Sequence, residues 1–344
     1  MTRRGGHTIF IFIVTFAYGL LGIGAYQYEK KRALIQVENL VKKYDDLFAV
    51  NDISLKIKKG EIFAFLGPNG AGKTTTIEIL EGIRKKTSGK AYVLGKDIDK
   101  KKELDSIKKV IGTLPQEFNT HQNLTVKENL RFWSKMYEKS LPIDDLIELV
   151  KLTDKAKVRY KNLSGGLKRR LGIAISLVND PELVFLDEPT TGLDPRARRE
   201  TWEVVENLKK QGKTIFLTTH YMEEAQVLAD TVAIIHKGDI IDIGTPTQLI
   251  DKHGGDNKVV VRCNNQEVRD QIYSILFELG PAENEDGDIV ISSKRGGLSK
   301  VVDLLDDNKI PYSDIISQRP TLEDVFLTLT GEVLIDTKEF EAPT

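Results

Sequence analysis

A glycine-rich segment at residues 67–74, Gly-Pro-Asn-Gly-Ala-Gly-Lys-Thr, has the residue types and the spacing of a phosphate-binding loop. The apolar run at residues 61–66 predicts a buried strand before it, and residues 75–83 predict a helix after it. In this order, backbone N–H groups of the loop and the positive end of the helix surround phosphate oxygens. A chance glycine-rich turn is the alternative, and the flanking elements argue against it.

Two side chains of this loop have separate roles in holding a nucleoside triphosphate. Lys73 is expected to reach the β- and γ-phosphates, and the hydroxyl of Thr74 is expected to hold Mg²⁺. The predicted nucleotide-binding residues of the loop and the helix start are Gly67, Pro68, Asn69, Gly70, Ala71, Gly72, Lys73, Thr74 and Thr75.

A pair of adjacent carboxylates, Asp187 and Glu188, follows the apolar run at residues 184–186. Neighbouring strand residues point to opposite faces, but at the end of a strand both can serve one site. Asp187 suits a metal-binding role, and Glu188 suits the polarisation of a water molecule that attacks the γ-phosphate. Two solvated acids at a strand end are the alternative interpretation.

A third group, Leu163, Ser164, Gly165 and Gly166, precedes a helix-like run at residues 167–177. A serine and two glycines at a helix start can form a second anion site. By themselves they are equally typical of an ordinary N-cap and turn.

With these motifs in this order, the chain resembles the ATP-binding subunits of ATP-binding-cassette (ABC) transporters over about residues 34–250. The motifs are Walker A at 67–74, the Q-loop at 114–116, the signature at 163–166, Walker B at 184–188, the D-loop at 191–194 and the switch histidine at 218–220. Strands and helices that alternate around the loop predict an α/β fold with a mostly parallel core sheet and an antiparallel β-subdomain. The resemblance adds a helical subdomain at about residues 119–163.

The resemblance also implies roles for residues whose types alone are not specific. Tyr44 would stack on adenine, Gln116 would bind Mg²⁺ or the attacking water, and His220 would donate to the γ-phosphate. Ser164 would act on the ATP of a second subunit in a homodimer or heterodimer, with Asp194 in the D-loop. A core aromatic, a turn residue and a core histidine are the alternatives for Tyr44, Gln116 and His220. The candidate catalytic residues are Glu188, His220 and Gln116, and the candidate metal ligands are Thr74, Gln116 and Asp187.

Composition agrees with a cytosolic enzyme of more than one domain. The chain has 344 residues and a net charge of −1, which gives no basic excess to attract nucleic acid. Its one cysteine, Cys263, excludes an internal disulfide and a cysteine-based metal site within one chain. The basic clusters at residues 168–170 and 196–199 are interpreted as solvated helix faces.

The N-terminus has an apolar segment at residues 5–28 that contains no Asp, Glu, Lys or Arg. A helix of this length is about 36 Å long, enough for a hydrocarbon core of about 30 Å. A transmembrane helix or anchor is predicted, with the ATPase on the cytoplasmic side because it needs cytosolic ATP. A cleaved signal peptide, an artefact and a permease remnant are the alternatives. Typical ABC ATPase subunits lack this segment.

After the cassette, residues 256–331 predict a small α+β domain, followed by a polar tail at 332–344. Strands are predicted at 258–262, 288–291 and 314–317, and helices at 267–279 and 298–305. The ending at residues 319–327 resembles the ABC-2-type drug-resistance exporter ATPases, the daunorubicin-resistance-like group. A capped amphipathic helix with Thr321 as its N-cap is the plainer interpretation.

The sequence therefore predicts an ATP-hydrolysing subunit of an ABC exporter at the cell membrane, with ATP and Mg²⁺ as its ligands. Closure of an ATP-bound dimer would drive a separate permease, expected to be of the ABC-2 type. An importer ATPase of the same fold is the main alternative. A soluble ABC ATPase acting on DNA or the ribosome is the other, and no nucleic acid partner is expected.

Overall fold

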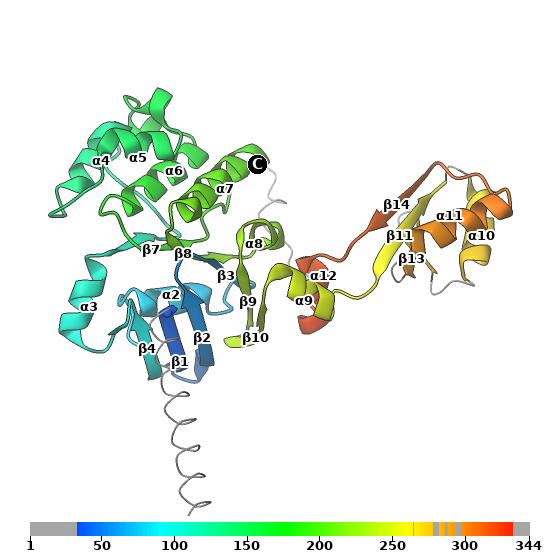
Figure 1. Cartoon of the computed structure of the whole chain (residues 1–344), viewed down its shortest axis with the longest axis horizontal. Coiled ribbons are helices and arrows are strands. Elements are labelled where there is room, and N and C mark those ends of the chain that lie inside the picture. Colours follow the sequence, from blue (N-terminus) through cyan, green and yellow to red (C-terminus); the bar gives the residue numbers. More distant parts are fainter. Residues whose placement is uncertain (1–32, 264, 278–281, 286–287, 294–296, 333–344) are drawn as a thin grey trace, which may run out of the picture. The chain divides into compact units, whose positions relative to one another are not determined.

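The computed structural model describes residues 33–332, apart from 264, 278–281, 286–287 and 294–296 (Figure 1). These residues divide into two compact units between Ile243 and Gly244. The predicted membrane segment at residues 5–28 and the polar tail from residue 333 onward lie outside the described residues. In the part that the structure does describe, no helix is both long enough and apolar enough to cross a membrane.

The first unit contains a six-stranded sheet in the order β10-β9-β3-β8-β7-β6. Strand β3 pairs in parallel with β8 and β9, and β7 pairs in parallel with β6 and β8, as the sequence predicts. The strands are β3 (Ile62–Leu66), β6 (Ile111–Leu114), β7 (Leu183–Asp187), β8 (Thr214–Thr219), β9 (Thr231–His236) and β10 (Asp239–Gly244). Because parallel strands end at the same edge, the loops after β3, β6, β7 and β8 share one edge of this sheet.

An antiparallel sheet in the order β2-β1-β4-β5 accompanies the parallel one. Its strands are β1 (Ala33–Tyr44), β2 (Leu47–Lys58), β4 (Ser88–Val93) and β5 (Lys96–Asp97). Helix α2 (Lys73–Leu80) contacts both sheets, and one apolar core joins side chains from the two sheets, from α2 and from α3 (Lys101–Lys108). This shared core fixes the start of α2 relative to the strand ends.

A helical region follows β6, where residues 119–163 were expected to be largely helical. The structure has α4 (Val126–Ser134), α5 (Ile143–Leu149) and two single 3₁₀ turns, η1 (Thr153–Lys155) and η2 (Tyr160–Asn162). Helix α4 begins at a capping box formed by Thr125 and Glu128, and α5 begins directly after its N-cap residue, Pro142. Helices α6 (Gly165–Ser176), α7 (Pro195–Lys210) and α8 (Met222–Leu228) follow the signature, the D-loop and β8.

The second unit contains a four-stranded antiparallel sheet in the order β12-β13-β11-β14. Its elements are β11 (Asn257–Arg262), α10 (Gln266–Leu276), β12 (Ala282–Glu285), β13 (Asp288–Ser293), α11 (Gly297–Asp307) and β14 (Asp314–Gln318). Strand, helix, two strands, helix and strand in this arrangement make a ferredoxin-like fold. Helices α9 (Pro246–His253) and α12 (Leu322–Thr330) belong to the same unit and pack on each other.

Candidate functional site

The phosphate-binding loop is held against neighbouring backbone at glycines that cannot be replaced without strain. A Cβ on Gly67 would lie 2.1 Å from the carbonyl oxygen of Ile235, and one on Gly72 would lie 2.2 Å from that of Ala49. Gly72 also has a φ of 103°, which turns the chain directly into α2. The helix therefore starts at Lys73, two residues earlier than the sequence predicts, and the predicted nucleotide-binding residues comprise the loop and the first residues of α2.

Lys73 is buried and directed back into its own loop. Its Nζ donates to the carbonyl oxygens of Gly67 at 2.7 Å and Pro68 at 3.0 Å. The same nitrogen lies 3.5 Å from Oε1 of Glu188. Burial lowers the pKa of Lys73, while Glu188 and Asp187 act in the opposite direction. The loop thus keeps a cation at the place where phosphate oxygens would need one.

Four side chains converge on the carboxylate of Glu188, which is 4% exposed. Gln116 Nε2 and Thr191 Oγ1 each donate to Oε2 at 3.0 Å, while Lys73 and His220 Nδ1 face Oε1 at 3.5 and 3.4 Å. Burial alone would raise the pKa of Glu188, but His220, Lys73 and Thr191 outweigh it and lower this pKa to about 2. The group is therefore an anionic hydrogen-bond acceptor at neutral pH.

Asp187 lies beside the helix start, as a metal ligand would. Its Oδ1 accepts from Thr218 Oγ1 and lies 3.4 Å from Thr74 Oγ1. Burial raises the pKa of Asp187, against the hydrogen bonds from Thr218 and Thr74. A divalent cation between these oxygens would reverse that shift, so the pair fits Mg²⁺ chemically. No cluster of three or more His, Cys, Asp or Glu side chains that could bind a metal occurs among the described residues.

His220 follows β8 and faces the carboxylate of Glu188, although its Nδ1 has no hydrogen bond of good geometry. Its ring lies 4.2 Å from the ring of Tyr221, measured between centroids. The guanidinium of Arg198 in turn lies 4.1 Å from the Tyr221 ring centroid. The tyrosine thus connects the helix after the D-loop with the switch histidine.

Tyr44 ends β1 and remains 36% exposed, so its ring is accessible from solvent. Its hydroxyl accepts from Arg84 Nη1, and the Nζ of Lys42 lies 4.5 Å from the ring centroid. An accessible flat ring beside two cations suits a purine with its phosphates. The stacking role stays a prediction.

The signature residues occupy a different place from the phosphate loop of their own chain. Ser164 is the N-cap of α6 and is exposed, and Gly166 packs so close to Ala197 that a Cβ would lie 2.7 Å away. A cavity of about 640 Å³ has Ser164, Gly166 and Asp194 among its lining residues. Within the described part of the chain, no hydrogen bond or ion pair joins Ser164 to Lys73 or Glu188.

The basic cluster at residues 168–170 is not the solvated helix face that the sequence predicts, because its two arginines turn toward the protein. Arg170 is only 7% exposed, and its guanidinium donates to the carbonyl oxygen of Lys151 and pairs with Glu200. Arg169 is half-buried and donates to backbone carbonyls after β6 and at the end of β7. The only signal was the position of both arginines directly after the signature, because periodicity cannot reveal backbone partners distant in sequence.

Comparison with known proteins agrees with this geometry. The family model described as "ABC transporter" matches residues 50–191. The linearmycin resistance ATP-binding protein LnrL of Bacillus subtilis is 38% identical over 88% of this chain and 100% of its own length. The daunorubicin resistance ATP-binding protein DrrA3 of Streptomyces coeruleorubidus is 35% identical over 87% of this chain and 96% of its own.

Solved structures extend the agreement to the fold. CbiO1 from Clostridium perfringens, part of an ABC transporter complex, is 28% identical with a TM-score of 0.58 over 72% of this chain and 98% of its own. The cassette MJ0796, in a dimeric post-hydrolysis state with ADP and Pi, is 25% identical with a TM-score of 0.56 over 61% of this chain and 98% of its own. The chain belongs to the ABC transporter family, as an ATP-hydrolysing subunit related to resistance and export ATP-binding proteins.

Proposed function

We propose that this subunit hydrolyses MgATP at composite sites between two ATPase subunits and so drives export through an ABC-2-type permease. The observation that carries the proposal is the convergence of Lys73, Gln116, Thr191 and His220 on the Glu188 carboxylate. A buried anion surrounded by donors and adjacent to a phosphate loop is the arrangement that a polarised water requires.

Each residue then has a definite task on ATP. The loop N–H groups and Lys73 bind the phosphates, and Tyr44 stacks on adenine. Glu188 accepts a proton of the attacking water as the water oxygen bonds to the γ-phosphorus, and the bond from that phosphorus to the bridging oxygen breaks to release ADP. Gln116 orients that water, and His220 donates to the γ-phosphate oxygens on which charge accumulates. When ATP enters, its phosphates replace the loop carbonyls and Glu188 as partners of Lys73.

Thr74, Asp187 and Gln116 would hold Mg²⁺. The cation would offset negative charge on the β- and γ-phosphates. The 3.4 Å separation of Thr74 Oγ1 and Asp187 Oδ1 supports this assignment, since hydroxyl and carboxylate oxygens are the ligands that Mg²⁺ prefers.

Two subunits are required because Ser164 is exposed at the start of α6 and has no partner in the phosphate loop of its own chain. A head-to-tail homodimer or heterodimer would bring the signature of one subunit to the ATP of the other. Asp194, which caps α7 beside the signature cavity, would border the same interface.

The carboxylate test is Glu188→Gln, which preserves size but removes the charge. The variant should bind ATP, lose at least about a hundredfold in kcat and accumulate as an ATP-bound dimer. Sizing and ATPase assays with and without ATP measure both effects. A variant that hydrolyses ATP at the normal rate, or stays monomeric at saturating ATP, would contradict the proposal.

The direction of transport is proposed from the relatives, several of which are named for resistance or export. The permease is a separate chain, because a single predicted membrane segment cannot enclose a pathway. Co-purification from membranes, followed by sequencing of the bound membrane protein, would identify it. A partner with an importer's substrate-binding protein would favour the importer alternative.

Residues 5–28 are proposed to anchor the subunit on the cytoplasmic side of the membrane. Apolar residues at the centre of a spanning helix contribute roughly −0.3 to −0.6 kcal/mol each, and one arginine costs about 2.5 to 3.5 kcal/mol. The wild-type chain should stay in the membrane fraction after carbonate extraction. The double variant Ile13→Arg and Phe16→Arg should therefore be released into the soluble fraction by the same treatment. A wild-type chain that is carbonate-soluble without a permease, or one that intact mass shows to be shortened, would refute the anchor.

A further inference from the structure

Arg169 lies on the signature helix, five residues after Ser164, and its side chain reaches the two strand ends that present Gln116 and Glu188. Its Nη1 donates to the carbonyl oxygens of Pro115 at 2.9 Å and Gln116 at 3.0 Å, directly after β6. Its Nε donates to that of Pro189 at 3.0 Å, and its Nη2 to those of Asp187 and Glu188, at the end of β7. Each of the five N–H donors of the guanidinium has one backbone acceptor.

Four of these five carbonyls lie beyond the last residue of β6 or β7, and the fifth belongs to Asp187, the last residue of β7. Strands β6 and β7 are parallel neighbours, and their pairing stops at Leu114 and Leu186. Beyond that point their carbonyl dipoles converge, and Glu188 adopts a positive φ of 48°, which is uncommon for a residue other than glycine. The planar guanidinium has donors in fixed directions, so it can hold the carbonyls at both strand ends and the Glu188 backbone at the same time. A lysine ammonium could not reach across the two strands in this way.

We propose that Arg169 is a positioning residue of the ATPase reaction, which holds the backbone of Gln116 and Glu188 in reacting register with the signature helix. The inference rests on the proposed role of Glu188. In this proposal Arg169 acts through the backbone carbonyls that it contacts and not by contact with ATP.

The chain offers a matched control at the other end of the same strand. Asn179, just beyond α6, donates from Nδ2 to the carbonyl oxygens of Lys109 and Ile111 at 3.0 Å each, before and at the start of β6. Asn179→Ala therefore also removes a side chain that staples backbone around β6. It does so away from Gln116 and Glu188.

The experiment compares Arg169→Lys and Arg169→Gln with Asn179→Ala in the full chain. We expect the Arg169 variants to lose at least tenfold in kcat per folded molecule, with affinity for a non-hydrolysable ATP analogue within threefold of wild type. Asn179→Ala should lower the melting temperature but change kcat less than twofold. Arg169 variants whose kcat per folded molecule equals that of Asn179→Ala would reduce Arg169 to a structural role.

A double-mutant cycle supplies the readout that a purely structural role would not change. If Arg169 acts through Gln116, then Arg169→Lys combined with Gln116→Ala should lose clearly less kcat than the product of the two single losses. Losses that multiply in full would overturn the proposal. That result would leave the role of Glu188 intact, because Glu188→Gln tests it separately.

Discussion

The two units of this chain use polar side chains in opposite ways. Among the described residues, every polar or charged side chain that is buried belongs to the first unit, including Lys73, Asp187, Glu188 and Glu224. The described core of the second unit is apolar apart from Cys263, with side chains such as Val259, Ile272 and Ile291. Buried polar groups cost free energy unless they are paired, so their concentration in one unit indicates where chemistry is located.

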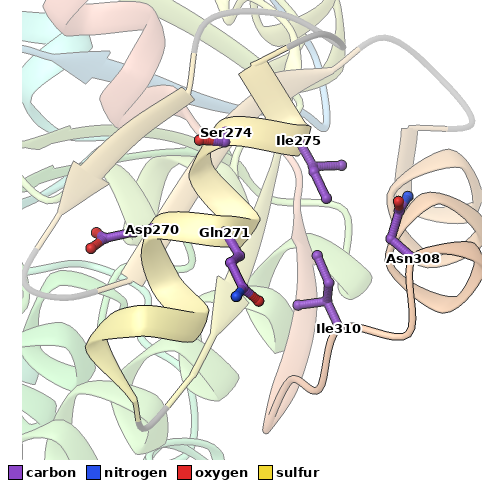
Figure 2. A pocket seen from close by; sticks show the side chains of 6 residues that line it. All are labelled: Asp270, Gln271, Ser274, Ile275, Asn308 and Ile310. Carbon is purple, nitrogen blue, oxygen red and sulfur yellow. The ribbon is translucent and has the colours of Figure 1, made fainter.

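The second unit has a surface hollow whose lining shows the same scarcity of charged groups. About 480 Å³ in volume, it lies between α10 and the segment after α11 (Figure 2). In Figure 2, Gln271, Ile275 and Ile310 project into it, whereas Asp270 points away from Ile310. Asp270 is its one ionisable lining residue, and it accepts from Gln266 at 3.2 Å. In the first unit, by contrast, the residues at the strand ends gather several polar and charged groups around the Glu188 carboxylate.

The largest effect is expected for the substitution that removes the cation of the phosphate loop. Lys73→Ala should lower kcat/KM for ATP about a thousandfold, equivalent to about 4 kcal/mol, because the phosphates lose a buried charge-assisted partner. Nucleotide titration should show weaker binding as well as slower turnover. Lys209→Ala, which removes a half-exposed lysine paired with Asp230, is the control and should change kcat/KM less than twofold. A Lys73→Ala subunit with normal ATP affinity would show that this buried charge of the first unit does not bind nucleotide.

The second prediction concerns the apolar core of the second unit. Ile272→Ala deletes a fully buried side chain of the apolar core and should destabilise that unit by about 3 kcal/mol. Thermal or urea unfolding followed with a probe in this unit measures the loss, and kcat per folded molecule should stay within twofold. Tyr273→Ala on the same helix removes a side chain that is 39% exposed, and should cost less than about 0.5 kcal/mol. A large kcat loss in Ile272→Ala would mean that the second unit takes part in catalysis.

The smallest effect depends on pH and concerns Glu81, a carboxyl at the end of α2 that is 6% exposed. Burial raises its pKa, with Asp187 and Glu78 adding to the shift, from 4.5 to about 8. The unfolded chain therefore releases this proton first, and the wild-type free energy of unfolding falls as pH rises from about 4.5 to 8. Glu81→Gln removes that penalty, and its advantage over wild type should grow by about 2 kcal/mol between pH 6 and 8.

Denaturant unfolding at several pH values measures this difference. Glu78→Gln on the same helix is the comparison, because Glu78 is partly exposed and paired with Arg84. It removes only the smallest of the three causes that raise the pKa of Glu81, so its gain over wild type at high pH should be clearly smaller than that of Glu81→Gln. An advantage of Glu81→Gln that is equal at pH 6 and pH 8 would show that the buried carboxyl does not titrate in this range.

Much of the fold could be predicted from local patterns. Residues 62–66 and 184–186 are apolar runs that the fold buries completely. The turn at Lys237 and Gly238, both at positive φ, favours a tight hairpin between β9 and β10. In the second unit, β12 was missed, because its sequence, Ala-Glu-Asn-Glu, has low strand propensity. It becomes a strand by pairing with β13 along Ala282 to Glu285. Strand pairing is a tertiary effect that a short polar segment does not encode.

The amino-acid sequence by itself determined the family and the residues available for chemistry, because the phosphate loop, the carboxylate pair and the signature have fixed local spacing. Only the tertiary structure decided which of these residues meet. It joins Gln116 to Glu188 across 72 positions of sequence and leaves Ser164 apart from both. It also converts Arg169 from an expected surface charge into a backbone clamp. A side chain's partners depend on where distant strands end, and that position follows from packing of the whole core.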